Sequence, residues 1–151
     1  GELPDSRLVA RRLGTQQLAL HAAPAYLRRV GRPAAPEALA RHSMLEFLPL
    51  GWRGQWRLAG PSRRSCALQL EPAFATDCGE ALLAAAVAGS GIAALPGWLA
   101  EKDVEAGRLQ PVLQGWHTRA VPIQAVYRGA GRLPVKTRAF LQHLVAAFAA
   151  A

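Results

Sequence analysis

The sequence predicts an α/β fold, in which strands alternate with helices around a mainly parallel sheet. Residues 18–22 alternate apolar and other side chains, as a half-buried strand does, and lead directly to Pro24, which favours the first turn of a helix. Residues 77–88 form the clearest helical stretch, and a short apolar strand over 91–95 follows it. Strands that alternate with helices in this way are typical of sheets covered by helices.

The first third of the chain predicts short elements separated by turns. These are a helix from Pro24 that ends at Gly31 and Pro33, a short helix over 36–42, a strand over 44–48 and an irregular hairpin over 51–60 that carries Trp52 and Trp56.

The middle of the chain predicts a strand–helix–strand unit from Leu68 to Pro96. Its first part, 67–76, reads as one extended segment bent at Pro72. Asp77 has the side chain of a helix cap, and Glu80, three residues later, has the spacing of a capping box. The alanines of this helix leave almost no polar face, so we expect it to be buried on more than one side.

The last third predicts a helix, two strands and a closing helix. These are a helix over 97–105 with the carboxylates of Glu101, Asp103 and Glu105, strands over 109–113 and 121–127, a loop over 129–134, and an amphipathic helix from Val135 through Phe148.

Composition excludes several classes of protein. The 151 residues are 51% hydrophobic and 19% charged, which excludes a disordered chain, and no apolar run has the length of a membrane helix. The net charge of +8 favours acidic partners, but the arginines are spread along the chain, and we favour a solvated surface over a nucleic-acid face. Cys66 and Cys78 are too few for a disulfide framework or a zinc site, so we expect two free thiols in a reducing compartment.

The chain opens without an initiator Met, on the turn-like segment 1–6. We therefore expect a fragment whose N-terminal partner is missing.

No arrangement of residues predicts an enzyme. Ser90 lacks the glycines two residues to either side that a nucleophile elbow needs, and the glycines around it lie between a helix and a following strand, the reverse of a dinucleotide-binding turn. The four histidines have no partners at ligand spacing. We predict no catalytic residue, no metal and no cofactor.

Tryptophan and arginine interleave over residues 52–57, a pattern that single-strand binders use. We favour the alternative that both indoles pack on the core while the arginines face outward.

Geometry points to a site for a small molecule. In an open α/β sheet, ligands bind beyond the carboxyl ends of the strands, where the next helices begin. Two segments fit this position, one after the first strand and one before the buried helix, and their residues are Ala22, Ala23, Pro24 and Thr76, Asp77, Cys78. Backbone N–H groups there suit a carboxylate or another small anion, whereas Asp77 suits an amine or hydroxyl.

Taken together, these segments resemble the effector-binding domain of LysR-type transcriptional regulators. The residues that carry the resemblance are 1–13 (GELPDSRLVARRL), 22–27 (AAPAYL), 87–96 (VAGSGIAALP), 105–109 (EAGRL) and 138–140 (RAF). They span essentially the whole chain in order.

The resemblance implies a periplasmic-binding-protein type II-like fold, with two α/β lobes joined by crossover strands and the effector between them. It implies a first-lobe remnant and crossover over 1–17, a complete second lobe over 18–116, and a crossover strand and C-terminal helix that return to the first lobe over 117–151. It adds Leu3, Pro4, Ser6 and Pro96 to the expected effector-binding residues. A swapped or intimate dimer would cover the apolar face of the last helix.

The function that follows is effector sensing in a bacterial, cytoplasmic regulator. The resemblance implies a small-molecule effector such as an organic acid or amino acid, a homodimer or tetramer, and DNA binding only through a winged helix-turn-helix outside this chain. Two alternatives remain open at this point: a free-standing solute-binding protein of the same fold, and a basic nucleic-acid module built on Trp52 and Trp56.

Overall fold

The computed structural model describes residues 8–128 and 133–150, which divide into two compact units. Unit 1 combines 8–16 with 120–128 and 133–150, and unit 2 is the continuous segment 17–119. The chain thus passes into unit 2 once and out of it once.

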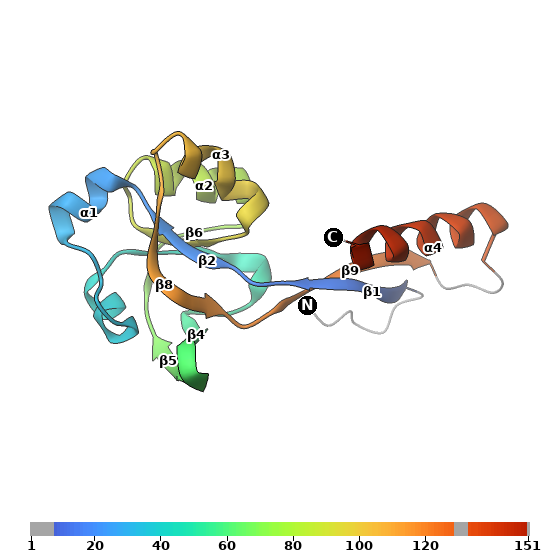
Figure 1. The fold of residues 1–151 in the computed structure, drawn as a ribbon, viewed down its shortest axis with the longest axis horizontal. Coiled ribbons are helices and arrows are strands. Elements are labelled where there is room, and N and C mark those ends of the chain that lie inside the picture. Colours follow the sequence, from blue (N-terminus) through green and yellow to red (C-terminus); the bar gives the residue numbers. More distant parts are fainter. Residues whose placement is uncertain (1–7, 129–132, 151) are drawn as a thin grey trace. The chain divides into compact units, whose positions relative to one another are not determined.

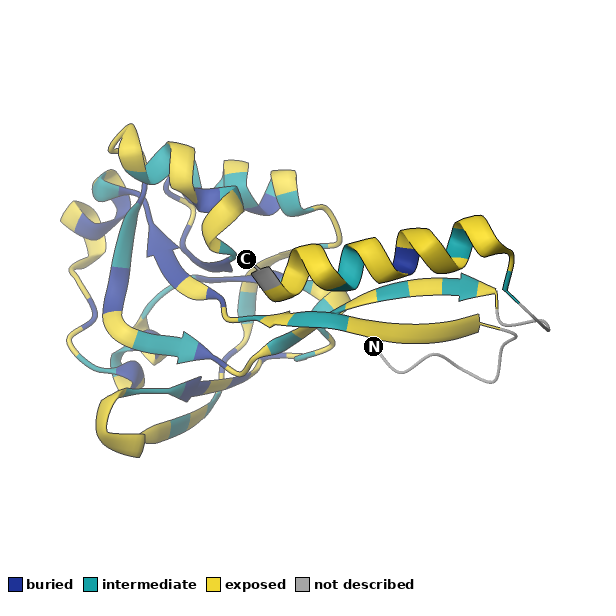
Figure 2. Cartoon of the chain, turned by 45° about the vertical axis from the view of Figure 1, so that its right-hand side comes forward, coloured by how far each residue is buried: buried dark blue, intermediate teal, exposed yellow. Residues whose placement is uncertain are grey.

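Unit 1 is a two-stranded antiparallel ribbon with one helix packed on it. Strand β1 (Leu8–Gln16) pairs with β9 (Val121–Arg128), and helix α4 (Val135–Ala150) follows (Figure 1). Along β9 half-buried and exposed residues alternate, and most of α4 is exposed (Figure 2). On α4 Leu141 is buried, whereas Phe140 is 61% exposed. The strand over 121–127 and the last helix are therefore confirmed, while β1 has no alternating pattern that predicts it.

Unit 2 is built on a seven-stranded sheet with the strand order β5-β4-β8-β2-β7-β3-β6. Its elements are β2 (Ala19–Ala22), α1 (Pro24–Val30), β3 (Met44–Phe47), β4 (Gln55–Ala59), β5 (Ser65–Gln69), β6 (Pro72–Thr76), α2 (Gly79–Val87), β7 (Ile92–Leu95), α3 (Gly97–Glu105) and β8 (Gln110–Thr118), with short 3-10 helices over Pro36–Arg41, Leu48–Leu50 and Pro61–Arg63.

The expectation of a mainly parallel sheet is wrong. The parallel pairs are β3 with β6 and β3 with β7, whereas β2 is antiparallel to β7 and β8, and β4 is antiparallel to β5 and β8. The reason is that β2 and β4 run opposite to the strands on both sides of them: β2 lies between β7 and β8, and β4 lies between β8 and β5. An alternation of strands and helices along the chain does not reveal which strands become neighbours.

The extended segment predicted over 67–76 is two separate strands. β5 and β6 lie at opposite ends of the strand order. The extended segment is interrupted between them, where the Leu70 N–H donates to Gly54 O at 2.8 Å. The hairpin predicted within 51–60 is corrected in the same way, because β4 pairs with β5 and only one arm lies in that range. The strand–helix–strand unit is therefore β6–α2–β7 and does not include Leu68.

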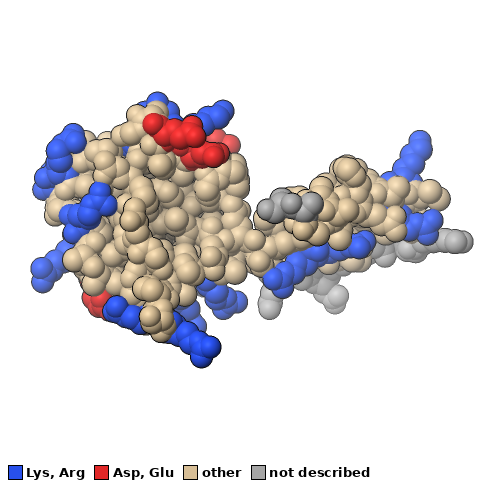
Figure 3. Space-filling model, in the orientation of Figure 1, with Lys and Arg blue, Asp and Glu red and all other residues tan. Residues whose placement is uncertain are grey.

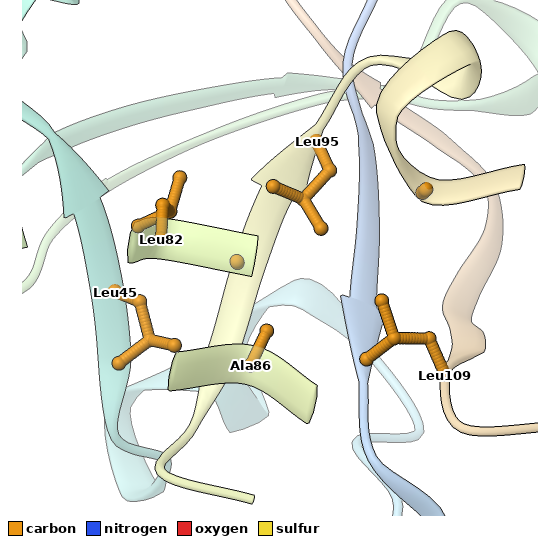
Figure 4. Close-up of a cluster of buried hydrophobic side chains, with 7 residues drawn as sticks. Leu45, Leu82, Ala86, Leu95 and Leu109 are labelled. Carbon is orange, nitrogen blue, oxygen red and sulfur yellow. The ribbon is translucent and has the colours of Figure 1, made fainter. Parts of the chain in front are cut away.

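One core cluster of unit 2 lies between the sheet and the helices α2 and α3. Leu45 of β3 and Leu95 of β7 meet Leu82 and Ala86 of α2, and Leu109 closes the cluster (Figure 4). Fully burying one such leucine stabilises the fold by about 1.5–3 kcal/mol.

Helix α2 is less buried than its composition predicts. Only Leu82 and Ala86 are buried, while Ala84 and Ala88 are exposed. The expectation of burial on more than one side is wrong because alanine exposes little apolar surface, so an alanine face tolerates water at small cost.

The capping box at Asp77 is also not formed. The N-cap of α2 is Cys78, one residue after the predicted cap, and its side chain makes no capping bond. The helix begins later because the chain turns where Thr76 Oγ1 accepts the Cys78 N–H at 3.1 Å. The exit of the helix follows the prediction, with Gly89 at φ +77.

Candidate functional site

One edge of the sheet in unit 2 collects the carboxyl ends of three parallel strands. Thr76 at the end of β6 is in register with Phe47 at the end of β3, and Leu95 at the end of β7 is in register with Ala19. The same Ala19 is in register with His117 of β8, which continues the row. We call this row the carboxyl edge.

Helices α2 and α3 both begin at the carboxyl edge, because each follows one of these strands. Their first turns are neighbours, since a Cβ placed on Gly79 would lie 3.7 Å from Leu99 Cδ2. Helix α3 has Pro96 at its N-cap and no acidic residue in its first turn, whereas α2 carries Glu80 in its first turn. The two helix ends thus offer adjacent N–H groups with different electrostatic surroundings.

The structure brings together four of the sequence-predicted site residues. Thr76, Asp77 and Cys78 lie between β6 and α2, and Pro96 lies between β7 and α3, so all four belong to the carboxyl edge. Asp77 and Cys78 are exposed, and the Cys78 thiol donates to Glu80 Oε2 at 3.4 Å.

Three other predicted residues lie at the opposite edge of the sheet. Ala22 is in register with Ile92, the first residue of β7, because β2 runs antiparallel to β7. Ala23 and Pro24 follow it, and Ala22 and Ala23 are buried. The expectation that both helix starts share one edge depended on a parallel sheet and is wrong for this reason. Leu3, Pro4 and Ser6 lie outside the described residues.

Sequence reasoning missed a buried carboxylate next to the carboxyl edge. Glu46 of β3 is 2% exposed, and its two oxygens accept the N–H groups of Arg53 and Gly54, each at 2.8 Å. Arg53 and Gly54 both have positive φ, and the Gln55 N–H donates to Trp52 O, so Glu46 holds a tight turn. The signal in the sequence is a single Glu in an otherwise apolar strand, which marks the position but not its partners.

Two histidines take part in partly buried hydrogen bonds at other places in unit 2. Tyr26 Oη accepts the Ser43 N–H at 2.9 Å and is hydrogen-bonded to His42 Nδ1 at 3.1 Å. Burial lowers the pKa of His42. Burial also lowers the pKa of His21, whose Nδ1 lies 3.0 Å from Ala19 O, a contact that acts in the opposite direction.

The packed interpretation of the Trp52–Trp56 pair is confirmed. Trp56 is 1% exposed, Trp52 is half-buried, and their rings meet edge to face with centroids 5.0 Å apart. Arg53 and Arg57 are exposed. Trp56 therefore has no free face on which a base could stack, and part of the Trp52 ring is covered as well.

The described ranges contain two free thiols and no cluster of metal-ligating side chains. Cys66 is half-buried and Cys78 exposed. No three His, Cys, Asp or Glu side chains within 8–128 and 133–150 gather around a point that would hold a metal ion. No helix in these ranges has the length and hydropathy needed to cross a membrane.

Comparison with known proteins relates nearly the whole chain to transcription regulators. The family model for the LysR substrate binding domain matches residues 1–149. An HTH-type transcriptional repressor of Pseudomonas aeruginosa is 33% identical over 99% of the chain and 47% of its own length, and the HTH-type transcriptional regulator CrgA of Neisseria meningitidis serogroup C is 33% identical over 96% of the chain and 48% of its own length. The chain therefore spans about half the length of these relatives.

Solved structures show the same fold. The CrgA regulatory domain from Neisseria meningitidis, a LysR-type transcriptional regulator, matches with a TM-score of 0.76 at 32% identity, over 98% of this chain and 72% of that one. The full-length virulence activator AphB of Vibrio cholerae matches with a TM-score of 0.78 at 27% identity, over 97% of this chain and 49% of that one. The fold is thus the periplasmic-binding-protein type II-like fold of LysR regulatory domains, and the chain belongs to the LysR substrate binding domain family.

Proposed function

We propose that this chain is the effector-sensing part of a LysR-type transcriptional regulator and that its effector binds at the carboxyl edge of unit 2. The observation that carries the proposal is the meeting of the α2 and α3 N-termini at the ends of β6 and β7, in a chain of this family. Ligands of open α/β sheets bind at this position. The matched relatives are transcription regulators and not enzymes, so a site that binds without reacting fits them.

The proposed assignment of the units follows from the family. Unit 2 corresponds to the second lobe, and unit 1 to the C-terminal part of the first lobe with both crossover strands. In the regulator, effector binding would shift the equilibrium between conformations of a dimer or tetramer in the cytoplasm, and a winged helix-turn-helix outside this chain would read the DNA. A free-standing solute-binding protein is less favoured, because the matched relatives are transcription regulators.

The chemistry of the carboxyl edge favours an amino acid over a simple organic acid. At the start of α3 the first N–H groups face no acidic side chain in their own turn, which suits a carboxylate. Asp77, exposed at the start of α2, suits an ammonium group. Thr76 and Pro96 would flank the two groups.

Chemical-shift mapping of the 15N-labelled chain with millimolar amino acids and organic acids tests this proposal. We expect shifts at Thr76–Glu80 and at Gly97–Leu99, and we expect D77N to abolish the response to amino acids. The control is E105Q, which removes an exposed carboxylate at the far end of α3. E105Q should respond as the parent chain does. The proposal fails if shifts cluster at Ala22–Pro24 instead, or if D77N responds to amino acids as strongly as E105Q does.

A further inference from the structure

We propose that the tip of the β4–β5 hairpin docks on the phosphate backbone of duplex DNA, a role that goes beyond effector sensing and uses residues outside the carboxyl-edge site. The surface consists of Arg57 on β4 and of Arg63 and Arg64 in the connection to β5, which we call the hairpin cations. Figure 3 shows basic side chains gathered over this hairpin at the lower left of the molecule.

The strand pattern turns these side chains to the solvent. Along β4 the buried residues are Trp56 and Leu58, so Arg57 between them points outward, on the face opposite to the core. Arg63 and Arg64 are exposed at the connection. The hairpin lies at one end of the strand order, with β5 as the last strand, so no further described strand covers it.

No acidic side chain on the hairpin neutralises this charge. Residues 51–69 contain no Asp or Glu. Within 8–128 and 133–150 the ion pair formed is Arg108 with Asp103, away from the hairpin. The exposed carboxylate of Glu37 contacts β5, where it accepts the Cys66 thiol at 3.6 Å. Three exposed cations beside one carboxylate leave a net positive surface, which favours a polyanion as partner.

Backbone hydrogen bonds within the tip restrict its conformation, which lowers the entropy lost on docking. The Gly60 N–H donates to Arg64 O at 2.8 Å, and the Arg64 N–H donates to Pro61 O at 3.1 Å. Ser62 and Arg63 have φ of +56° and +59°, a left-handed conformation that costs a non-glycine residue about 1–2 kcal/mol. Strained backbone of this kind is retained where its surroundings enforce it, often at functional positions.

The aromatic groups nearby decide between duplex and single-stranded partners. The ring of Trp116 is covered by Arg64 and Gly60: Arg64 Cζ lies 5.2 Å from the ring centroid, and a Cβ on Gly60 would lie 2.7 Å from ring atoms. Trp56 is buried. Single-strand binders need free aromatic faces for bases, whereas contact with a duplex backbone needs only cations and N–H donors. Because the matched relatives are transcription regulators, DNA is the polyanion we infer.

Binding of the 151-residue chain to a fluorescent duplex of arbitrary sequence, measured by anisotropy over a series of salt concentrations, tests the proposal. We expect R57Q/R63Q/R64Q to weaken binding about tenfold or more at low salt, and to make the slope of log K against log salt shallower by about 2.7, since each phosphate contact contributes about 0.9. The double variant R57Q/R63Q, which leaves Arg64 on Trp116, should lose about 1.8 of that slope.

The matched control is R28Q/K102Q/R119Q, which removes the same charge from exposed positions elsewhere in unit 2. It should change affinity by less than about twofold. Equal losses in the two triple variants, undetectable duplex binding by the parent chain, or tighter binding to single strands than to the duplex would each overturn the proposal. None of these results bears on effector binding, which is read at Thr76–Glu80.

Discussion

The Leu18 N–H donates to Thr118 Oγ1 at 3.2 Å, while the Thr118 N–H donates to Leu18 O at 3.0 Å. These two residues stand where the chain passes into and out of unit 2, and both are buried. The Thr118 hydroxyl also donates to Arg119 O at 3.2 Å. One side chain thus joins the two passages of the chain.

Replacing this hydroxyl tests its contribution. T118V keeps the shape of the side chain but leaves the buried Leu18 N–H without its acceptor, so we expect a loss of about 1–3 kcal/mol in the free energy of unfolding. T118S retains the hydroxyl and should lose less. Urea denaturation followed by tryptophan fluorescence measures both, and a T118V stability equal to that of T118S would contradict the assignment.

The buried carboxylate of Glu46 predicts a second large effect. E46Q places an amide NH2 against one of the two N–H groups of Arg53 and Gly54, so we expect about 1–3 kcal/mol of destabilisation and faster exchange of those two amides. The control is E71Q, an exposed position at which we expect little change. Hydrogen exchange read by NMR separates loosening of this turn from a general loss of stability, and unchanged Arg53 and Gly54 protection in E46Q would refute it.

Gly91 is required for a close approach of two backbones. A Cβ at this position would lie 2.3 Å from Ser43 O, which accepts the Ile92 N–H at 2.8 Å. We expect G91A to cost about 1–3 kcal/mol by overpacking. G97A is the matched control, because a Cβ on Gly97 meets nothing within 4 Å. Thermal unfolding of both variants checks this, and equal melting temperatures would be inconsistent with it.

Acid should destabilise unit 2 through its histidines. Burial lowers the pKa of His21 and of His42 below the ordinary value of 6.5, so the unfolded chain binds more protons than the folded chain as the pH falls through and below that value. Stability is therefore complete above about pH 6.5 and declines below it. We expect the fall in Tm between neutral and mildly acidic buffer to shrink in H21L and H42Q and to persist in H143Q, which replaces an exposed histidine. An unchanged acid sensitivity in both buried-site variants would argue against this origin.

The two thiols should differ in reactivity. Burial raises the pKa of the Cys66 thiol, the Glu37 carboxylate adds to this shift, and Arg64 partly opposes it. Since the thiolate is the reactive form, Cys78 in the C66A variant should react faster with a chromogenic disulfide reagent than Cys66 in the C78A variant. Cys66 reacting at the same rate or faster would contradict this order.

Much of the fold could be predicted from the sequence because local signals agreed with the tertiary structure. Pro24, Gly89 and the all-apolar strand β7 mark real element boundaries, and α3 begins and ends where its pattern predicts. Strand direction could not be predicted, because β2 pairs with β7 and β8, which lie far away along the chain. The split of 65–76 into two strands depends on the Leu70–Gly54 bond, a contact that no local pattern encodes.

The candidate site could be predicted only in part. The segment Thr76–Cys78 stands before a strongly periodic helix, so its position followed from local signals, although the cap itself formed at Cys78. Placing Ala22–Pro24 at the same edge required the direction of β2, which the local pattern lacks. Glu46 could not be interpreted from the sequence either, because its partners are backbone N–H groups presented by a turn of positive φ.

The pairing of β2 also has a consequence for biosynthesis. Leu20 is in register with Ala94 of β7 and with Val112 of β8, so the second strand to be translated waits for the last strands of its sheet. Loop closure over such separations slows folding. While the later strands are still being translated, the nascent chain exposes β2 as an apolar strand without partners. Unit 2 should therefore fold only after translation has passed β8, and during that delay residues 18–22 are the segment that a chaperone of hydrophobic specificity would bind.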